Sequence, residues 1–352
     1  MKAALYTAPG RIELAEVDVP EIGADDLLVR VRAASICGTD LRIFQHGHFK
    51  IPAGTRRVLG HELAGEVVAA GERVRGYPVG TRVAVAPNVG DGTCDMCRRG
   101  LNNMCPRYEA FGVSLDGGFQ EYMRIPGFAL QQGNVFALPD GVDWRAAALV
   151  EPLSCAWHGM DKLGVGADDV VVIVGAGPIG LLHLLLSRVL GARRTIVASS
   201  PGPRLALARE LGADVVVDVR AERLEEVVRR ETGGRGADVV VTCVSKPEVM
   251  SESIGLLATL GRVNFFGGLG RGADVPIDAN RVHYGGLLVT GTTGSRNADY
   301  AASLRLVADG RVDLARLVTR TFPFARVQDA FAAAASKQEI KVMLLDEERA
   351  AR

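Results

Sequence analysis

A glycine-rich turn lies between an apolar strand and a helix near the middle of the chain. The strand is the β-branched run Val170–Val174, and the turn opens an apolar segment that continues to Leu186. Its residues follow the pattern G-x-G-x-x-G: Gly175, Ala176, Gly177, Pro178, Ile179 and Gly180. The first glycine makes the turn, the second lets a pyrophosphate approach, and the third permits close packing of helix on strand. The helix N-terminus favours the anion. We therefore predict a dinucleotide-binding βαβ unit, the alternative being a glycine-rich turn without a nucleotide.

The pattern of strand-like and helix-like segments changes along the chain. Residues 1 to about 150 contain short β-type runs separated by Gly and Pro, such as Leu27–Val31 and Glu66–Ala70. From about 153 to 290, strand-like and helix-like segments alternate, which predicts an α/β fold with a doubly wound parallel sheet. We expect residues 154–289 to form this domain, inserted into a mostly-β domain made of residues 1–153 and 290–352.

Composition excludes several classes of partner. Lys plus Arg and Asp plus Glu both number 41, so no net charge attracts nucleic acid or an anionic membrane. The longest apolar run, Val170–Leu186, is broken by three glycines, a proline and a histidine, so we predict no membrane span. Met1–Tyr6 is typical of a short strand rather than of a targeting segment. We therefore expect a cytoplasmic protein.

The end of the second predicted strand bears on cofactor choice. In NAD-binding proteins an acidic residue there holds the ribose 2′-hydroxyl. The chain has no carboxylate between Gly191 and Arg209; the strand ends in Ser199 and Ser200, with Arg204 nearby. Small hydroxyl residues beside an arginine favour a 2′-phosphate, so we predict NADP(H) over NAD(H). The alternative is a solvated Arg204 and NAD(H) bound without the acidic contact.

Potential metal ligands are concentrated in the first half of the chain. Cys94, Cys97 and Cys105 lie within twelve residues, a spacing more typical of a metal site than of disulfides. Cys37-Gly38-Thr39-Asp40, Gly60-His61-Glu62 and Glu151-Pro152 each supply one or more further donors. Zinc binds cysteine sulfur, histidine nitrogen and carboxylate oxygen, and a catalytic site leaves one position for water or substrate. Together these residues form a candidate zinc set.

The order of these motifs resembles the zinc-containing medium-chain alcohol dehydrogenase family, and its sorbitol, threonine and sugar dehydrogenase branch. The resemblance extends from Met1 to about Leu345 and implies a GroES-like catalytic domain joined to a Rossmann domain. It implies that Cys37, His61 and Glu62 bind a catalytic zinc, with Glu151 bound directly or through water. Thr39 is similar to the hydroxyl that passes the substrate proton outward.

The chain departs from the family pattern at the second zinc site and at the proton relay. Relatives carry four cysteines in the lobe, and here Asp91 stands at the first position, before Cys94, Cys97 and Cys105. A carboxylate can bind zinc, so we predict a structural zinc at these four residues; a lobe without metal is the alternative. Arg42 stands where many relatives have a relay histidine, and His46 or His48 is a candidate substitute. Val150 replaces a carboxylate of some polyol dehydrogenases.

The resemblance implies hydride transfer between a nicotinamide cofactor and a secondary alcohol of a polyol, cyclitol or sugar, or its ketone. It also implies a homodimer or homotetramer. One alternative is a zinc-free quinone or enoyl reductase on the same fold, which would not need Cys37, His61, Glu62 and Glu151 together. A second is a non-enzymatic nucleotide-binding protein, which could lose the zinc ligands or Thr39.

Overall fold

The computed structural model of the protein describes residues 1–270 and 272–346. The chain divides into two compact units. The first comprises Met1–Ser154 and the chain from Ser295 onward, and the second comprises Cys155–Gly294. The second unit extends beyond residue 289 because strand β16 (Leu288–Gly291) still pairs with β15 (Leu257–Phe265) in its sheet.

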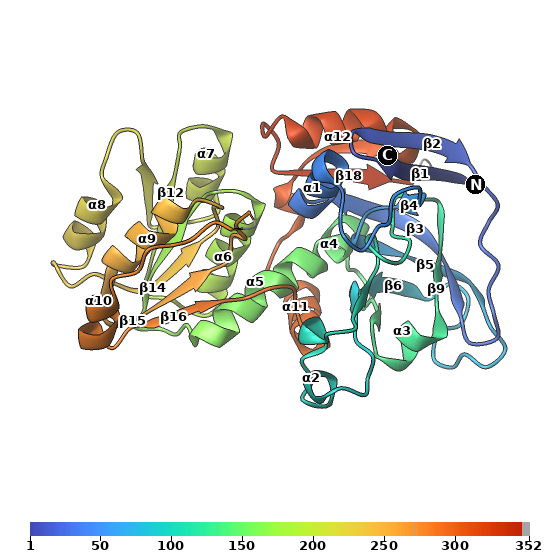
Figure 1. Ribbon diagram of the computed structural model, residues 1–352, viewed down its shortest axis with the longest axis horizontal. Helices are drawn as coiled ribbons and strands as arrows, with labels where there is room; N and C mark the ends of the chain where they lie inside the picture. The colour runs from blue at the N-terminus through green and yellow to red at the C-terminus, as the bar shows by residue number, and fades with distance from the viewer. Residues whose placement is uncertain (271, 347–352) are drawn as a thin grey trace. The chain divides into compact units, whose positions relative to one another are not determined.

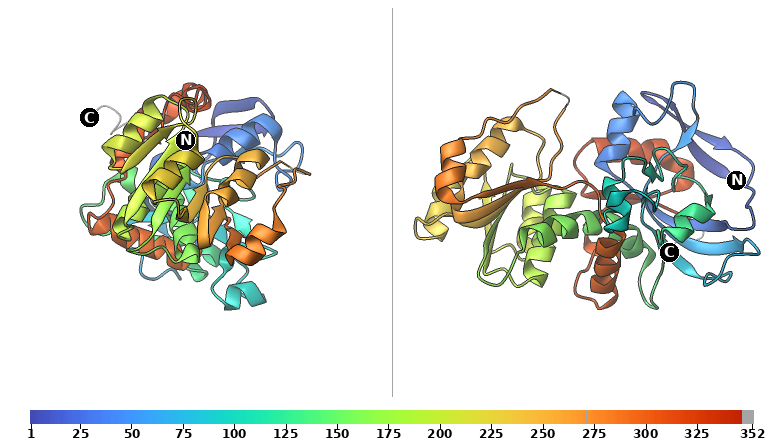
Figure 2. Two further views of the ribbon diagram at one scale, coloured as in Figure 1. Left: turned by 90° about the vertical axis from the view of Figure 1, so that its left-hand side faces the viewer. Right: turned by 60° about the horizontal axis from the view of Figure 1, so that its bottom comes forward.

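The second unit contains a six-stranded parallel sheet in the order β13-β12-β11-β14-β15-β16 (Figure 1). Figure 2 shows helices on both faces of this sheet. Every residue of the central strand β11 is buried, as expected for a parallel sheet covered on two sides. The remaining strands are β12 (Arg194–Ser199), β13 (Val215–Asp218) and β14 (Ala237–Thr242). The helices are α6 (Pro178–Val189), α7 (Pro203–Glu210), α8 (Leu224–Glu231), α9 (Pro247–Gly255) and α10 (Ala279–Gly285).

The first unit is mostly β, and its largest sheet has the order β10-β6-β5-β3-β18-β17, with β9 also paired to β3. The last of the described strands, β18 (Lys341–Leu345), pairs antiparallel with β3 (Leu27–Ile36), so segments about 300 residues apart in sequence lie side by side in this sheet. The other strands of this sheet are β5 (Glu62–Ala70), β6 (Arg82–Val85), β9 (Tyr122–Ile125), β10 (Val135–Ala137) and β17 (Val318–Pro323). A smaller sheet comprises β1 (Lys2–Ala8), β2 (Arg11–Glu16) and β4 (Arg57–Val58).

Helices and a two-stranded sheet complete the first unit. Helix α12 (Val327–Ala335) contacts β17 and β18, and α11 (Asn297–Ala308) contacts α4 (Trp144–Ala148). Helix α5 (Val150–Leu163) contains the boundary between the two units. The other elements are α1 (Gly38–His46), α2 (Asp95–Arg98), α3 (Gly127–Gln131), and the paired strands β7 (Asn88–Val89) and β8 (Glu109–Ala110).

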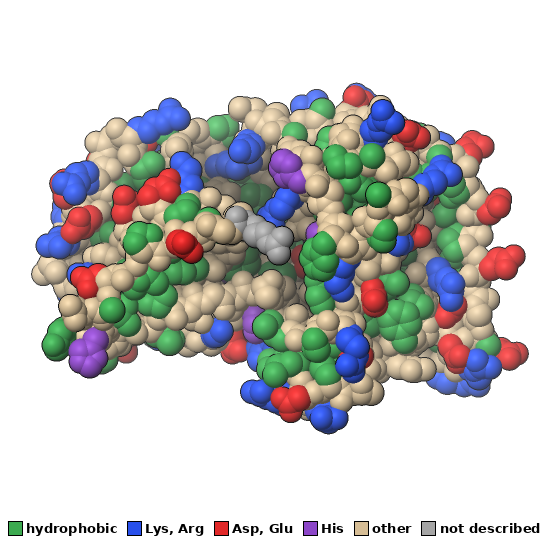
Figure 3. Space-filling view, viewed as in Figure 1, with side chains coloured by type: hydrophobic (Ala, Val, Ile, Leu, Met, Phe, Trp, Pro, Cys, Tyr) green, Lys and Arg blue, Asp and Glu red, His purple; other side chains and the backbone are tan. Residues whose placement is uncertain are grey.

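The apolar run from Val170 is divided between β11 and α6. Over residues 1–270 and 272–346, no helix has both the length and the apolarity to cross a membrane. Basic and acidic side chains are interspersed over the face in Figure 3, in keeping with the zero net charge.

Candidate active site and cofactor site

Cys37 lies where strand β3 ends and helix α1 begins. Its Sγ accepts a hydrogen bond from the Thr39 amide at 3.1 Å, and its own amide donates to Asp40 Oδ2 at 2.9 Å. Cys37 and Asp40 also form a capping box at the start of α1, so the helix start fixes the thiol. Thr39 is partly exposed beside it.

His61 lies opposite Cys37, and its Nε2 is 3.0 Å from Cys37 Sγ. Asp40 links the two segments, because its Oδ1 accepts the Gly60 amide at 3.2 Å and lies 3.6 Å from His61 Nδ1. Gly60 has a φ of 92°, and a Cβ there would lie 2.6 Å from the Phe119 ring, so only glycine fits. The arrangement holds a sulfur and an imidazole nitrogen facing each other.

The charges around this pair are unbalanced. Burial raises the pKa of Cys37, and Asp40 and Glu62 raise it further. Burial opposes the charged form of His61, but the negative charges of Cys37, Asp40 and Glu151 outweigh it and raise its pKa well above the usual value. A divalent cation would balance the negative charge of the buried carboxylates and would stabilise the Cys37 thiolate directly. The donor set therefore fits a metal ion.

Neither Glu62 nor Glu151 belongs to the group of donor atoms formed by Cys37, Asp40 and His61. The donor atoms of Cys37, Asp40 and His61 lie within 4.8 Å of one another, while the Glu62 carboxylate is ion-paired with Lys341. Glu62 and Lys341 are only 2% and 4% exposed. Lys341 also donates to the Ile36 carbonyl at 3.3 Å. Glu151 is buried, near enough for its charge to raise the pKa of His61.

Sequence reasoning missed Asp40 and Lys341. The signal for Asp40 was an acid three residues after a helix-capping position, which is the pattern of a capping box. Lys341 had no local signal, because it reaches Glu62 from a strand 279 residues away.

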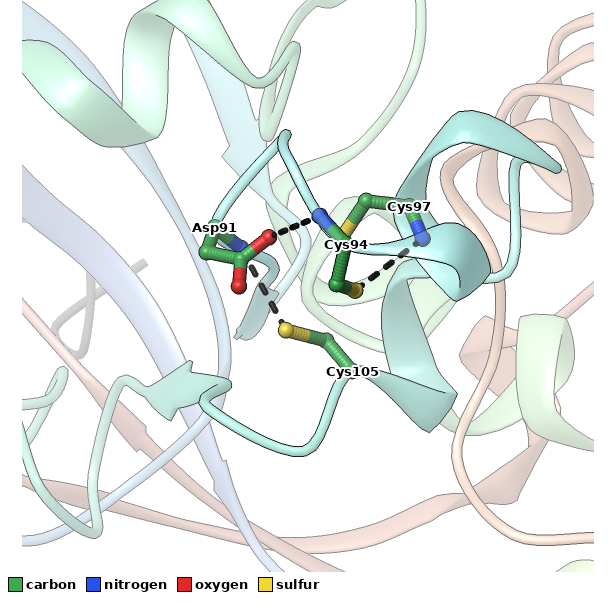
Figure 4. A group of neighbouring side chains, drawn as sticks. All are labelled: Asp91, Cys94, Cys97 and Cys105. Atoms are coloured by element: carbon green, nitrogen blue, oxygen red, sulfur yellow. Dashed lines mark hydrogen bonds between the residues drawn. The ribbon is translucent and has the colours of Figure 1, made fainter.

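A second group of donors lies in the loop and short helices between β7 and β8. The ligand atoms of Asp91, Cys94, Cys97 and Cys105 lie within 4.8 Å of one another, and Figure 4 shows the four side chains converging. Asp91 Oδ1 accepts the amides of Thr93 and Cys94 at 2.8 and 2.9 Å. The sequence prediction of these four residues thus corresponds to one cluster.

The thiols of this cluster also favour a cation. The Cys97 amide lowers the pKa of Cys94, whereas burial and the neighbouring thiols raise the pKa of Cys97 to about 12. Amides of Cys94 and Thr93 lower the pKa of Asp91. A Cβ on Gly90 would lie 2.6 Å from Cys97 Sγ, so the backbone packs tightly against the sulfur. Three sulfurs and one carboxylate are a suitable tetrahedral set for zinc.

The glycine-rich turn joins β11 to α6 as predicted. Gly175 has a φ of 107° and its amide donates to the Ala198 carbonyl at 2.7 Å. A Cβ on Gly180 would lie 1.8 Å from the Gly175 carbonyl oxygen, which makes glycine necessary there. A Cβ on Gly177 would meet only Arg204 Nη1, at 3.9 Å. The turn is therefore open at Gly177, where a phosphate would approach, with Pro178 and Ile179 beginning the helix.

Arg204 lies beside this opening, near the start of α7. Burial lowers its pKa, so its guanidinium is partly desolvated. Ser199 is the last residue of β12 and Ser200 follows it. The structure thus brings the predicted arginine to the glycine turn.

Comparison with known proteins identifies two family models in the chain. The alcohol dehydrogenase GroES-like domain matches residues 23–139, and the zinc-binding dehydrogenase domain matches residues 178–309. L-threonine 3-dehydrogenase of Pseudoalteromonas atlantica is 32% identical over 95% of this chain and 96% of its own. Sorbitol dehydrogenase of Bacillus subtilis is 30% identical over 94% and 92%.

A solved structure from Sinorhizobium meliloti, described as a zinc-binding dehydrogenase bound to NADP, superposes with a TM-score of 0.90. It is 34% identical and covers 98% of each chain. These matches confirm the predicted resemblance and the combination of GroES-like and Rossmann domains. The chain belongs to the zinc-containing medium-chain alcohol dehydrogenase family.

Proposed function

We propose that this protein is a zinc-dependent dehydrogenase for a secondary alcohol of a polyol, cyclitol or sugar, or for the matching ketone. The first unit carries the chemistry and the second binds the nicotinamide nucleotide. The observation that carries the proposal is the facing pair Cys37 Sγ and His61 Nε2, 3.0 Å apart beside buried carboxylates. Relatives named for a threonine and a sorbitol substrate support the alcohol chemistry.

Cys37 and His61 would hold the catalytic zinc, with Glu151 as a further donor directly or through water. The bound zinc supplies Lewis acidity, and the nicotinamide supplies the hydride acceptor. Asp40 orients His61 and holds the helix start. Glu62 acts through its charge while it is paired with Lys341, and joins the ligands only if that pair opens.

Thr39 would take the hydroxyl proton; its position two residues after Cys37 and its partial exposure support this role. Arg42 cannot extend this relay, since a guanidinium stays protonated near neutral pH. We propose that the proton leaves Thr39 to solvent.

A substrate screen tests the proposed function. Polyols, cyclitols and sugars are incubated with zinc-loaded protein and either NAD or NADP, and reduction is followed by nicotinamide absorbance. Turnover of at least one secondary alcohol is expected. Absence of turnover in a protein shown to contain zinc and to bind cofactor would reject the proposal.

We propose that Asp91, Cys94, Cys97 and Cys105 bind a structural zinc. Asp91→Ala is expected to release one zinc per chain and to lower the melting temperature more than the activity per folded molecule, because metal binding is coupled to local folding. Zinc content and thermal unfolding are measured together.

Two matched variants separate the possible roles of Asp91. Asp91→Asn keeps an oxygen for the Thr93 and Cys94 amides but removes the charge, whereas Asp91→Cys restores a fourth sulfur. Zinc should be retained in Asp91→Cys. Unchanged zinc content in Asp91→Ala would show that Asp91 is not a ligand.

We propose a preference for NADP(H) over NAD(H). Ser199 and Ser200 do not repel a 2′-phosphate, and the guanidinium of Arg204 suits one because its donors match phosphate oxygens in pairs. Ser199→Asp is expected to reverse the preference, by about tenfold to a hundredfold in the ratio of kcat/KM values. Both cofactors are compared at one ionic strength, with Ser199→Asn as the uncharged control. A wild-type enzyme tenfold better with NAD would contradict this assignment.

We propose that the protein is a cytoplasmic homodimer or homotetramer. Strand β16 is the edge of the parallel sheet, and its Leu288 is 46% exposed. An unpaired apolar edge strand can form hydrogen bonds with a strand of another subunit. Light scattering at micromolar concentration is expected to give at least twice the chain mass, and Leu288→Lys should lower it. A monomeric wild type would count against the proposal.

A further inference from the structure

The segment after Asp40 carries a concentration of positive charge in a chain with no net charge. Residues 41–57 contain Arg42, Lys50, Arg56 and Arg57, and also His46 and His48, but no aspartate or glutamate. Arg57 is paired with Asp116 at 2.9 Å. Among the described residues, Arg42 and Lys50 have no carboxylate within ion-pair distance.

Arg42 lies in α1, the helix whose first turn carries Cys37 and Thr39. Arg42 follows Thr39 by three residues in α1, so the two side chains lie on neighbouring positions of one face. Both are outside the buried face formed by Asp40 and Ile43. Helical side chains lean toward the preceding turn, which here contains Cys37 and Thr39. The rise of a helix places the Arg42 backbone about 4.5 Å beyond Thr39.

Lys50 lies in the loop after α1, beside His48. Its Nζ contacts the Tyr108 carbonyl and lies 3.7 Å from the centre of the Tyr108 ring, so a polar and an aromatic group hold it without neutralising it. Its amide donates to His48 Nδ1 at 3.2 Å. Burial, Lys50 and Arg42 together lower the pKa of His48. Arg42 and Lys50 therefore place positive charge around His48, and among the described residues no carboxylate lies within ion-pair distance of either cation. Such a group of cations favours the binding of an anion.

We propose that Arg42 and Lys50 bind an anionic group, a phosphate or a carboxylate, at the end of the alcohol substrate away from the reacting carbon. This inference rests on the proposed function and narrows its substrate class. A substrate hydroxyl beside Cys37 and His61 would place such a group a few carbon atoms along the chain, within reach of the Arg42 side chain. Arg42 would then bind the substrate from the sequence position at which many relatives have a relay histidine.

The test compares matched substrates with zinc-loaded enzyme and saturating cofactor. One pair is a polyol and its terminal phosphate ester, and the other is a polyol and the corresponding sugar acid. The anionic member of at least one pair is expected to have a kcat/KM at least tenfold higher, and the pair that shows the gain distinguishes phosphate from carboxylate. Equal values within both pairs would overturn the proposal.

Variants assign the effect to the two cations. Arg42→Gln and Lys50→Gln should each reduce kcat/KM for the anionic substrate about tenfold to a hundredfold more than for its neutral partner. Arg42→Lys should recover part of the loss. Arg11→Gln, which removes an exposed arginine from β2, is the charge control and should not change the ratio. A cofactor titration by nicotinamide fluorescence is run on each variant, and an equal loss of cofactor affinity would overturn the assignment to substrate.

Calorimetric titration of the phosphate ester and the sugar acid gives a second readout that needs no turnover. If either compound binds the wild type and binds Arg42→Gln at least tenfold more weakly, the anion site is supported. This holds even if no alcohol is oxidised, and in that case only the proposed function fails. No binding to the wild type, alongside turnover of neutral alcohols, rejects the anion site alone.

Discussion

Alcohol oxidation is expected to fall by more than about a thousandfold in Cys37→Ala, while cofactor binding stays nearly unchanged. The Cys37 thiol and the His61 imidazole face each other across 3.0 Å, and loss of the thiol removes both a proposed metal ligand and the cap of α1. The glycine turn at Gly175 lies in the other unit, so it does not depend on this cap. Steady-state kinetics, zinc content and a nicotinamide fluorescence titration measure the three effects.

Cys155→Ala is the matched control, since it makes the same chemical change at a cysteine outside both donor groups. It should retain both zinc and activity. Chelation of the wild type should reproduce the Cys37→Ala phenotype, and zinc addition should restore activity to the chelated protein only. Full activity in a protein shown to be free of metal would refute the zinc mechanism.

Lys341→Met is expected to lower the free energy of unfolding by about 3–5 kcal/mol, because it leaves the Glu62 charge buried without its partner. Both side chains of this pair are almost fully buried, and Lys341 also holds the Ile36 carbonyl at the end of β3. Cys37 follows Ile36 directly, so the same change should loosen the metal site. Urea unfolding of the zinc-loaded protein measures the effect on stability.

Two further variants distinguish loss of the buried pair from a general effect of the substitution. The double variant Lys341→Met with Glu62→Gln should recover much of the stability, since no buried charge is left unpaired. Arg320→Met breaks an exposed pair with Glu339 and should cost only about 0–1 kcal/mol. If Lys341→Met unfolds at the same urea concentration as Arg320→Met, the buried pair does not stabilise the fold.

The Rossmann domain could be predicted from the sequence because its signals are local. The apolar strand at Val170, the turn at Gly175 and the helix from Pro178 occupy consecutive positions, and each follows from residue type. A contact within the turn itself excludes any side chain at Gly180, because a Cβ there would collide with the Gly175 carbonyl oxygen. Donor types for zinc were likewise visible, since cysteines at short spacing are distinctive.

What the sequence by itself determined was therefore the type of each element and the chemistry of its donors. Tertiary structure alone decided which carboxylates meet which partners: Asp40 lies beside His61, and Glu62 pairs with Lys341. That last pair depends on β18 lying antiparallel to β3, with Val342 opposite Ile36. Sheet pairing across some 300 residues is set by burial of whole faces, and no local pattern around Glu62 or Lys341 encodes it.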